Sequence, residues 1–394
     1  MKTYKLSELI KIKNGADYKH LTKGTIPLYG TGGLMEYVND YLFDGESVLL
    51  PRKGSLDNIM YVNGKFWTVD TMYWTIIDKS LVYPKYLYYY LSLLDLSSRN
   101  SGSTLPSMTF DSYYTLEVNL PSLKEQKKII DVINPIDNKI EINSQINDNL
   151  QQMAKTIYDY WFTQFDFPNY NSKAYKSTNG KLVWNNELKK SIPSKWTVMK
   201  LKDTIEHINT GLNPRNHFVL NDGDVKYVTV KNLTVNGTLD FKGSDTISIK
   251  TKQIINKRSK LAKGDVLFAS IAPLGRCFIV NETPNDWEIN ESVFSIRPNK
   301  TISAEYLYLY FMSDWFIKTA EHSSTGSIFS GIRISSLENM PILVPDANTM
   351  ASFTKEMKPI FELRQKYQDE ILKLESLREY LLPTLMNGQT TISD

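Results

Sequence analysis

One glycine-rich stretch of this 394-residue sequence has the residue types of a phosphate-binding site. Tyr29-Gly30-Thr31-Gly32-Gly33 resembles the loops whose backbone N–H groups cradle phosphate. In a nucleotide-binding loop, however, Lys-Ser or Lys-Thr follows, and the loop joins a strand to a helix. Neither feature is present here, so we predict that this stretch does not bind a nucleotide.

A second stretch has the acidic residues of a metal-dependent nuclease. Pro345-Asp346 followed by Glu356-Met357-Lys358 fits the spacing of such a core. We expect these acids to fall on a helix, whereas the nuclease core places them on a β-hairpin. Pro168-Asn169-Tyr170 also lacks the second proline of the catalytic loop used for base methylation. We therefore predict no catalytic residue in this chain.

Composition excludes several other classes of site. One cysteine and four scattered histidines provide no zinc-ligand spacing and no disulfide framework. The net charge of +3 permits nucleic-acid binding without arguing for it. No signal peptide is recognisable, and no apolar run approaches the roughly 18 residues that span a membrane. We predict a cytoplasmic protein of two or three domains that binds no metal.

The longest helical pattern in the first half runs from about Pro121 to Gln164. Ser122 and Glu125 form a capping-box pattern, and Asn134-Pro135 has the pattern of an N-cap followed by proline at the first helical position. Beyond it, alternating spacings of three and four predict a heptad seam of Ile136, Lys139, Asn143, Ile146, Leu150, Met153, Ile157 and Tyr160. Adding 224 to each number gives a second seam of Ile360, Leu363, Tyr367, Glu370, Leu374, Leu377, Leu381 and Thr384.

Each of these helices exposes one apolar stripe that must be buried against a partner. Two copies in one chain can supply each other, so we predict a pair of long helices in an antiparallel or crossed arrangement. The alternative is that each helix belongs to a separate core.

The repeat extends beyond the helices. Lys5-Leu6-Ser7-Glu8-Leu9-Ile10 matches Lys200-Leu201-Lys202-Asp203-Thr204-Ile205, and Gly45 to Leu49 matches Lys263 to Leu267. Tyr86 to Tyr90 matches Tyr306 to Tyr310 on a predicted helix. These tyrosines could form a stacking platform for bases, but we predict that they are core residues. Ordered matches of this kind indicate two copies of one unit.

Strand patterns make each unit α+β with a mostly β core. Strands are predicted at Met72 to Ile77, Val225 to Val230, Asp265 to Ser270 and Ser292 to Ile296. Residues 16–44 and 212–262 differ in length and sequence, so we predict two related ligand sites of different specificity. Residues 165–195 are rich in Asn, Ser, Gly and Lys and form a linker whose aromatic residues attach it to a neighbouring surface.

Several phrases of the linker region are typical of one protein family. They are Trp161-Phe162, Phe165-Asp166-Phe167-Pro168, Lys181-Leu182-Val183-Trp184 and Ile192-Pro193 followed by Trp196. With the two helix-closed repeats and the Gly102-Ser103 and Gly326-Ser327 blocks, they resemble the DNA specificity subunit of type I restriction-modification systems. The resemblance covers essentially the whole chain.

This resemblance implies two mostly β target recognition domains, each reading half of a split site in double-stranded DNA, linked by two long helices in a pseudo-two-fold antiparallel coiled coil. The expected parts are recognition domains at 1–121 and 196–345, helical spacers at 122–164 and 346–388, a linker at 165–195 and a tail at 389–394. It further implies docking of two modification (methyltransferase) subunits, to which restriction subunits add in a phage-defence complex. S-adenosylmethionine, ATP and Mg are then expected in those partners, and this chain binds no cofactor.

Within this family, candidate DNA contacts are polar residues in loops where glycine lets the backbone approach the duplex. In the first domain they are Lys23, Tyr29, Thr31, Arg52, Lys53, Ser103 and Thr104. The counterparts predicted in the second domain are Asn213, Arg215, Lys231, Asn232, Arg276, Ser327 and Arg333.

Two alternatives to a non-catalytic DNA reader remain open. One is an enzyme of the same repeat class, such as a nuclease or a related type II restriction-methylation enzyme, and the other is a coiled-coil adaptor without DNA affinity. An enzyme would need an additional catalytic domain, for which the repeats leave no room.

Overall fold

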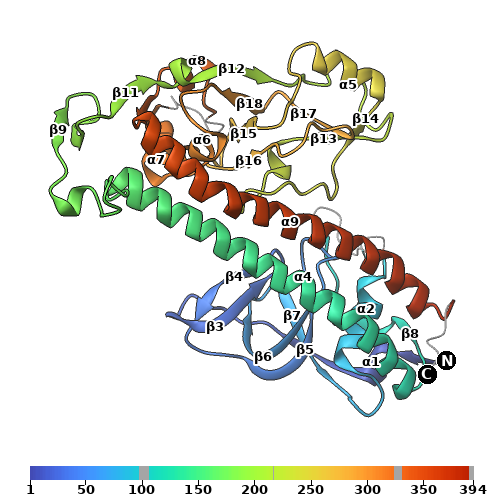
Figure 1. Ribbon diagram of the computed structural model, residues 1–394. Helices are drawn as coiled ribbons and strands as arrows, with labels where there is room; N and C mark the ends of the chain where they lie inside the picture. Colours follow the sequence, from blue (N-terminus) through green and yellow to red (C-terminus); the bar gives the residue numbers. More distant parts are fainter. Residues whose placement is uncertain (97–105, 216, 324–330, 390–394) are drawn as a thin grey trace. The chain divides into compact units, whose positions relative to one another are not determined.

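The computed structural model describes residues 1–96, 106–215, 217–323 and 331–389. The chain divides into two compact units, one of Met1–Glu141 with Leu372–Asp394 and one of Ile142–Ile371. Each unit combines one mostly β domain with part of each of two long helices, α4 (Leu123–Tyr158) and α9 (Ala347–Met386) (Figure 1). The predicted α+β class is confirmed. Among the described residues, no helix is both long and apolar enough to cross a membrane.

The first domain is built on a six-stranded sheet with the order β2-β7-β5-β6-β3-β4, and β1 pairs with β8 beside it. The strands are β1 (Lys2–Lys5), β2 (Ile10–Asn14), β3 (Lys23–Gly30), β4 (Gly33–Val38), β5 (Phe43–Pro51), β6 (Met60–Thr68), β7 (Met72–Ile77) and β8 (Glu117–Leu120). Its short helices are α1 (Leu6–Leu9), α2 (Pro84–Ser92) and α3 (Phe110–Tyr114).

The second domain contains a four-stranded sheet, β12-β18-β15-β16, a three-stranded sheet, β14-β13-β17, and the pair β11-β19. The strands are β11 (Thr197–Lys200), β12 (Ile205–Thr210), β13 (Val225–Val228), β14 (Thr246–Ile247), β15 (Val266–Ala269), β16 (Cys277–Ile279), β17 (Trp287–Ile289), β18 (Val293–Pro298) and β19 (Pro341–Val344). Its helical segments are η4 (Leu201–Thr204), η5 (Val230–Asn232), α5 (Ile249–Asn256), α6 (Ala304–Phe311), α7 (Asp314–Ser323) and α8 (Ile334–Glu338).

Strand register shows that the two domains share one framework. The order β2-β7-β5-β6 corresponds to β12-β18-β15-β16, and β1-β8 corresponds to β11-β19. Both frameworks also require a glycine at the same point, because a Cβ would lie 2.0 Å from the Val69 carbonyl oxygen at Gly15 and 1.8 Å from that of Ile289 at Gly211. The internal repeat therefore extends to individual backbone contacts.

The segments between framework strands differ, as predicted. The first domain adds the β3–β4 hairpin, whereas the second adds β13, β14 and α5. One predicted strand is too long, because β13 ends at Val228 and the following residues form the 3₁₀ segment η5. There the Thr229 and Asn232 side chains close a capping box that supports a turn.

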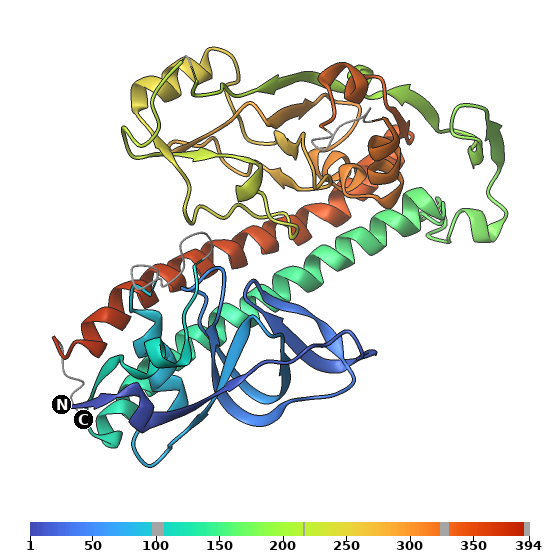
Figure 2. The ribbon, with the colours of Figure 1, turned by 180° about the vertical axis from the view of Figure 1, so that it is seen from behind.

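Helices α4 and α9 run side by side and antiparallel (Figures 1 and 2). In the first unit, Arg378 Nη1 of α9 lies 3.1 Å from Asp137 Oδ1 of α4. In the second unit, Arg364 Nη2 of α9 donates to Gln151 Oε1 of α4 at 2.7 Å. An early residue of one helix thus meets a late residue of the other, which confirms the antiparallel pair and makes the separate-core alternative wrong.

The predicted heptad period is correct, but alternate seam positions are displaced by one residue. Met153, Leu363 and Leu377 are 45%, 42% and 44% exposed. Ala154 and Arg364, which follow Met153 and Leu363, are buried instead, and Arg378, which follows Leu377, is half-buried. Of the other predicted seam residues, Ile360 is buried, and Ile136, Ile146, Leu150, Ile157, Leu374 and Leu381 are half-buried. The buried seam therefore carries polar residues that an apolar heptad search passes over.

Helix α4 also starts earlier than its proline suggests. The Ser122–Glu125 capping box forms, with Ser122 N donating to Glu125 Oε2 at 3.0 Å. The helix then continues through Pro135 without a new N-terminus, so the predicted second start at Asn134 is wrong. The Asn134 side chain accepts a hydrogen bond from Lys85 of α2 instead of capping a helix.

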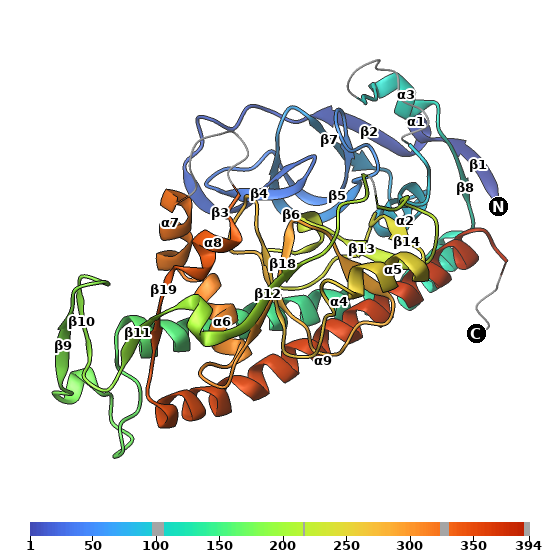
Figure 3. The same ribbon diagram turned by 90° about the horizontal axis from the view of Figure 1, so that it is seen from above.

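The linker packs onto the second domain. Phe165 and Phe167 are buried, and the Phe167 ring stacks on Trp196 with centroids 4.7 Å apart. Further along the linker, the strands β9 (Leu182–Asn185) and β10 (Lys190–Pro193) pair with each other (Figure 3). Its aromatic residues thus attach it to a neighbouring surface, as predicted.

Candidate nucleic-acid interface

Three predicted DNA-contacting residues of the first domain lie close together at one end of its sheet. Thr31 is in the turn between β3 and β4, and its carbonyl oxygen accepts a hydrogen bond of 2.6 Å from Asn58 Nδ2. Arg52 and Lys53 follow β5, and Arg52 N donates to the Thr71 carbonyl at 2.8 Å. A Cβ placed on the adjacent Gly54 would lie 3.6 Å from Thr31 Oγ1. The cluster combines two cations with a hydroxyl group, which suits contact with phosphate and base edges.

Lys23 and Tyr29 lie outside this cluster. Lys23 is exposed at the opposite end of β3, which spans about 25 Å for its eight residues. Tyr29 is half-buried against the core residues of β5 and β6. Burial and the neighbouring Tyr37 and Glu141 raise the pKa of the Tyr29 hydroxyl. Ser103, Thr104 and Ser327 lie outside the described residues.

In the second domain, Asn213 and Arg215 form a compact turn. Asn213 Oδ1 accepts a hydrogen bond from Arg215 N at 3.0 Å, and Asn213 Nδ2 donates to Glu291 Oε1 at 2.7 Å. The turn holds the backbone while the Arg215 side chain is exposed. Arg215 is therefore free to reach a ligand, and Asn213 positions it.

Asn232 requires a correction, because we expected it on an exposed loop. It is buried, and its Oδ1 accepts from Thr229 N at 2.7 Å. Its Nδ2 donates to the Asp240 carbonyl at 2.7 Å and to Ser244 Oγ at 2.8 Å. No hydrogen remains for a base edge, so Asn232 stabilises its own loop. The adjacent Lys231 is exposed and keeps the candidate role.

The side chains of Arg276 and Arg333 differ in their exposure to solvent. Arg276 is half-buried, and its Nη1 donates to the Leu233 carbonyl at 3.3 Å. Arg333 is exposed immediately before α8 and makes no side-chain capping bond there. Arg333 is therefore the more accessible cation of the two.

The framework also changes which residues are equivalent between the domains. Lys53 forms an isolated bridge with Ser107, and Ile271 forms the same bridge with Gly331. Arg52 N donates to Thr71 O at 2.8 Å, and Ser270 N donates to Ser292 O at 3.0 Å. The counterpart of Lys53 is thus Ile271, and Arg276 is not equivalent to either cation. The block match of Gly45 to Leu49 with Lys263 to Leu267, extended by four residues, would have identified this pair.

The prediction that the helical tyrosines are core residues is correct for three of the four. Tyr86, Tyr306 and Tyr308 are at most 1% exposed, and Tyr88 is half-buried. Tyr306 donates its hydroxyl hydrogen to the Leu343 carbonyl. Tyr306 and Tyr308 therefore join α6 to the sheet and to α9 and offer no face to a base.

The nuclease-like acids do not converge. Asp346 caps α9, with Oδ2 accepting from Thr349 Oγ1 at 2.8 Å, whereas Glu356 is exposed on α9. Across the described part of the chain, no group of three or more His, Cys, Asp or Glu side chains is placed to hold a metal ion. The helical placement of Glu356 agrees with the prediction from sequence.

Comparison with known proteins adds an independent observation. Residues 1–152 and 193–373 match the family model of the type I restriction modification DNA specificity domain. The MjaIX specificity subunit of Methanocaldococcus jannaschii is 24% identical over 361 residues, covering 90% of this chain and 79% of that protein. The HindI specificity subunit of Haemophilus influenzae is 24% identical over 390 residues, covering 85% and 82%. A crystal structure of the type I S subunit from M. genitalium has the same fold, with a TM-score of 0.57, 14% identity and coverage of 98% and 95%.

Proposed function

Because the chain belongs to the type I restriction-modification DNA specificity family, we propose that it is the non-catalytic subunit that reads a bipartite DNA site. One observation carries this proposal: two equivalent frameworks support unlike loops. The backbone bridge after β5 presents Lys53, and the equivalent bridge after β15 presents Ile271. Equivalent positions with different side chains are what two readers of different half-sites need.

We further propose that α4 and α9 set the spacing between the half-sites. Helix α4 has 36 residues and α9 has 40, which corresponds to about 54 and 60 Å at a rise of about 1.5 Å per residue. One turn of DNA is about 34 to 36 Å long. Helices of this length can therefore leave unread base pairs between two read segments.

In this proposal, the partner subunits catalyse the reactions. Two modification subunits dock on the chain, and restriction subunits join through them. S-adenosylmethionine, ATP and Mg serve those partners. The helix placement of Glu356 and the capping role of Asp346 support a chain without its own nuclease centre.

Half-site binding tests the proposal. With the modification subunit present, replacing Arg52 and Lys53 by alanine should weaken binding to DNA variants of one half-site and leave discrimination at the other intact. Replacing Arg276 and Arg333 should have the converse effect, provided that thermal unfolding shows an intact fold. Equal affinity of both variants and wild type for every DNA would refute this assignment of the contacting residues.

The runner-up is a specificity subunit or domain of a related type II enzyme, or an active nuclease of the same repeat class. Purified chain that cleaves DNA with Mg²⁺, and loses that cleavage on Glu356→Gln, would favour the nuclease.

A further inference from the structure

Arg364 of α9 carries a charge that is almost fully buried in the second unit. The residue is 7% exposed, and the ring centroids of Tyr308 and Phe361 lie 5.9 and 5.6 Å from its Cζ atom. A buried cation is costly unless a carboxylate or another anion lies beside it. The groups around Arg364 therefore show how its charge is balanced.

The hydrogen-bond partners of Arg364 are neutral. Nη2 donates to Gln151 Oε1 at 2.7 Å and to the Asn236 carbonyl at 2.5 Å, and Nη1 donates to Tyr308 Oη at 3.4 Å. Burial raises the pKa of the nearby Asp148 carboxyl group more than Arg364 lowers it, and Asp148 Oδ1 accepts from Asn236 Nδ2 at 2.8 Å. Within the described chain, the guanidinium forms no ion pair, and its Nε has no hydrogen-bond partner.

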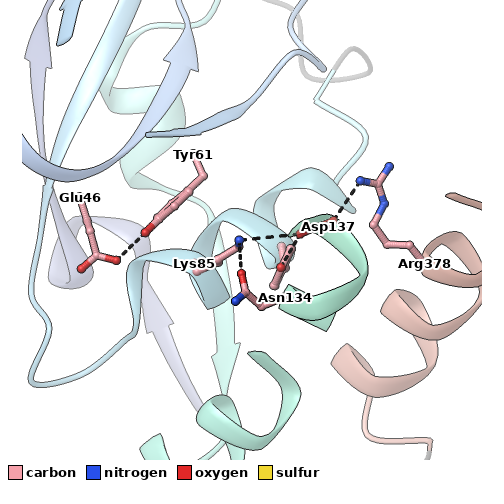
Figure 4. Close-up of polar contacts among 7 residues, drawn as sticks. Glu46, Tyr61, Lys85, Asn134, Asp137 and Arg378 are labelled. Atoms are coloured by element: carbon pink, nitrogen blue, oxygen red, sulfur yellow. Dashed lines mark hydrogen bonds and ion pairs between the residues drawn. The ribbon is translucent and has the colours of Figure 1, made fainter. Parts of the chain in front are cut away.

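The other arginine of the helix seam has the carboxylate that Arg364 lacks. Arg378 and Arg364 are fourteen residues, or two heptads, apart on α9. Asp137 and Gln151 are likewise fourteen residues apart on α4. In the first unit, Arg378 Nη1 lies 3.1 Å from Asp137 Oδ1 (Figure 4). The seam therefore makes the corresponding contact twice, once with a carboxylate and once with the neutral amide of Gln151.

Arg364 also lines a cavity of about 30 Å³ in the second unit, and it is the one charged residue on the described wall. The wall includes the amide side chains of Asn147 and Gln368, and Asn147 Oδ1 has no hydrogen-bond partner among the described residues. One water molecule needs about 10 to 15 Å³ by this measure. The cavity is therefore too small for phosphate or sulfate, but it accommodates a monatomic anion.

Charge favours an anion over water in this cavity. A halide beside the guanidinium balances the positive charge, and the attraction is strong because the surroundings have a low dielectric constant. The side-chain amide of asparagine or glutamine can turn so that its N–H₂ group takes the place of its oxygen. Asn147 and Gln368 can therefore both donate to an anion, whereas a water molecule would leave the charge of Arg364 unbalanced.

We propose that this cavity is a halide site, in which a chloride ion accepts hydrogen bonds from Arg364 Nε and from the amides of Asn147 and Gln368. Asn147 belongs to α4, and the other two residues belong to α9. Arg364 also holds the turn at residues 236–237 through the Asn236 carbonyl. The ion therefore stabilises the attachment of the second β domain to both helices. This inference does not depend on the proposed function.

Bromide is a probe with an anomalous X-ray signal. Crystals of the full-length chain soaked in sodium bromide should show an anomalous peak beside Arg364 Nε and none beside Arg378. Gln151→Glu places a carboxylate where the amide oxygen contacts Arg364, so the peak should disappear in this variant. Gln152→Glu adds the same charge at an exposed position of α4 and should retain the peak.

Thermal unfolding tests the same site in solution. Wild type, Gln151→Glu and Gln152→Glu are each unfolded in sodium bromide and in sodium gluconate at equal ionic strength. The gluconate anion is too large for the cavity, and effects of the two salts on the protein surface are common to all three proteins. At saturating bromide, the change in Tm from gluconate to bromide should be about 1 to 3 °C more positive for wild type and Gln152→Glu than for Gln151→Glu.

Two results would overturn the proposal. The first is a wild-type cavity that holds only water in bromide crystals, and this result is decisive even if Gln151→Glu does not fold. The second is a bromide peak, or a bromide-dependent change in Tm, that is equal in wild type and Gln151→Glu, because Arg364 would then not be the group that binds the ion.

Discussion

At the scale of single residues, Glu288 of β17 is a carboxyl group held where the charged form is unfavourable. It is 1% exposed, and burial raises the pKa of its carboxyl group from 4.5 to about 7, a shift that the Ile289 N–H and Lys252 oppose in part. Because the folded-state pKa is the higher one, the folded chain holds this proton between about pH 4.5 and 7 while the unfolded chain releases it. The buried carboxyl group of Glu288 therefore lowers the free energy of unfolding as pH rises through that window.

We expect Glu288→Gln to remove this pH dependence. Above pH 7 the variant should be more stable than wild type by up to about 3 kcal/mol, and the difference should disappear near pH 4.5. Chemical denaturation at several pH values measures it, with the exposed Glu282→Gln as a control. A stability difference that grows on acidification would contradict the assignment.

Lys53 and Ile271 provide a matched exchange at one framework position. If Lys53 contacts phosphate, Lys53→Ile should reduce the salt dependence of DNA binding by about one counterion, and Ile271→Lys should increase it by a similar amount. Titrations of the complex at several salt concentrations measure both slopes. Parallel slopes for all three proteins would exclude a phosphate contact at this position.

Single residues also show which side-chain environments could not be predicted from the sequence. Residue type and loop position predicted exposure for Arg215, Lys231 and Arg333, and all three are exposed. Asn232 has the same type and loop position, yet it is buried by hydrogen bonds to Asp240 and Ser244. These partners are near in sequence but meet only after the loop has folded, and no local pattern encodes that closure.

At the scale of elements, the α4–α9 seam is held partly by charge. Asp137 of α4 accepts from Arg378 Nη1 at 3.1 Å and from Tyr89 Oη at 2.5 Å, and Lys85 Nζ lies 4.0 Å away. The period of three and four residues was visible in the sequence, because helix geometry imposes it. The sequence did not show which residue of each pair faces the other helix. Arg364 and Ala154 are buried, whereas the more apolar Leu363 and Met153 are exposed.

A double-mutant cycle tests the seam pair. Asp137→Ala and Arg378→Ala should each destabilise the chain, and their coupling energy should be about 1 to 2 kcal/mol, because the side chains are only 17% and 32% exposed. The control is Lys127–Asp131, whose side chains are 63% and 60% exposed and whose coupling should stay below about 0.5 kcal/mol. Equal coupling in both pairs would show that the seam charge does not fix the helix pair.

Lengthening both helices tests their role as a spacer. Seven residues inserted after Glu141 in α4 and seven after Ile371 in α9 preserve the heptad register and fall at the boundary between the two units. Each insertion adds about 10.5 Å, which corresponds to about three base pairs. The methylated site should gain that spacing and keep both half-sites. Changed half-sites with unchanged spacing would refute the spacer role.

At the scale of the whole chain, the repeat was the most predictable feature. The offset of 224 residues anticipated that α4 and α9 would be equivalent, and the framework sheets extend that equivalence to backbone hydrogen bonds. What could not be anticipated is which side chains of strands, helices and loops far apart in sequence come together in the folded chain. Two copies of one framework, each with its own loops, support the proposal that the chain reads two different half-sites.

The most direct test is the methylation pattern of a host genome with and without this gene, in the presence of its modification subunit. Sequencing that detects modified bases should find a bipartite motif, two specified segments separated by a fixed unspecified spacer, only when the gene is present. An unchanged pattern, or a gene-dependent motif that is continuous, would contradict the account.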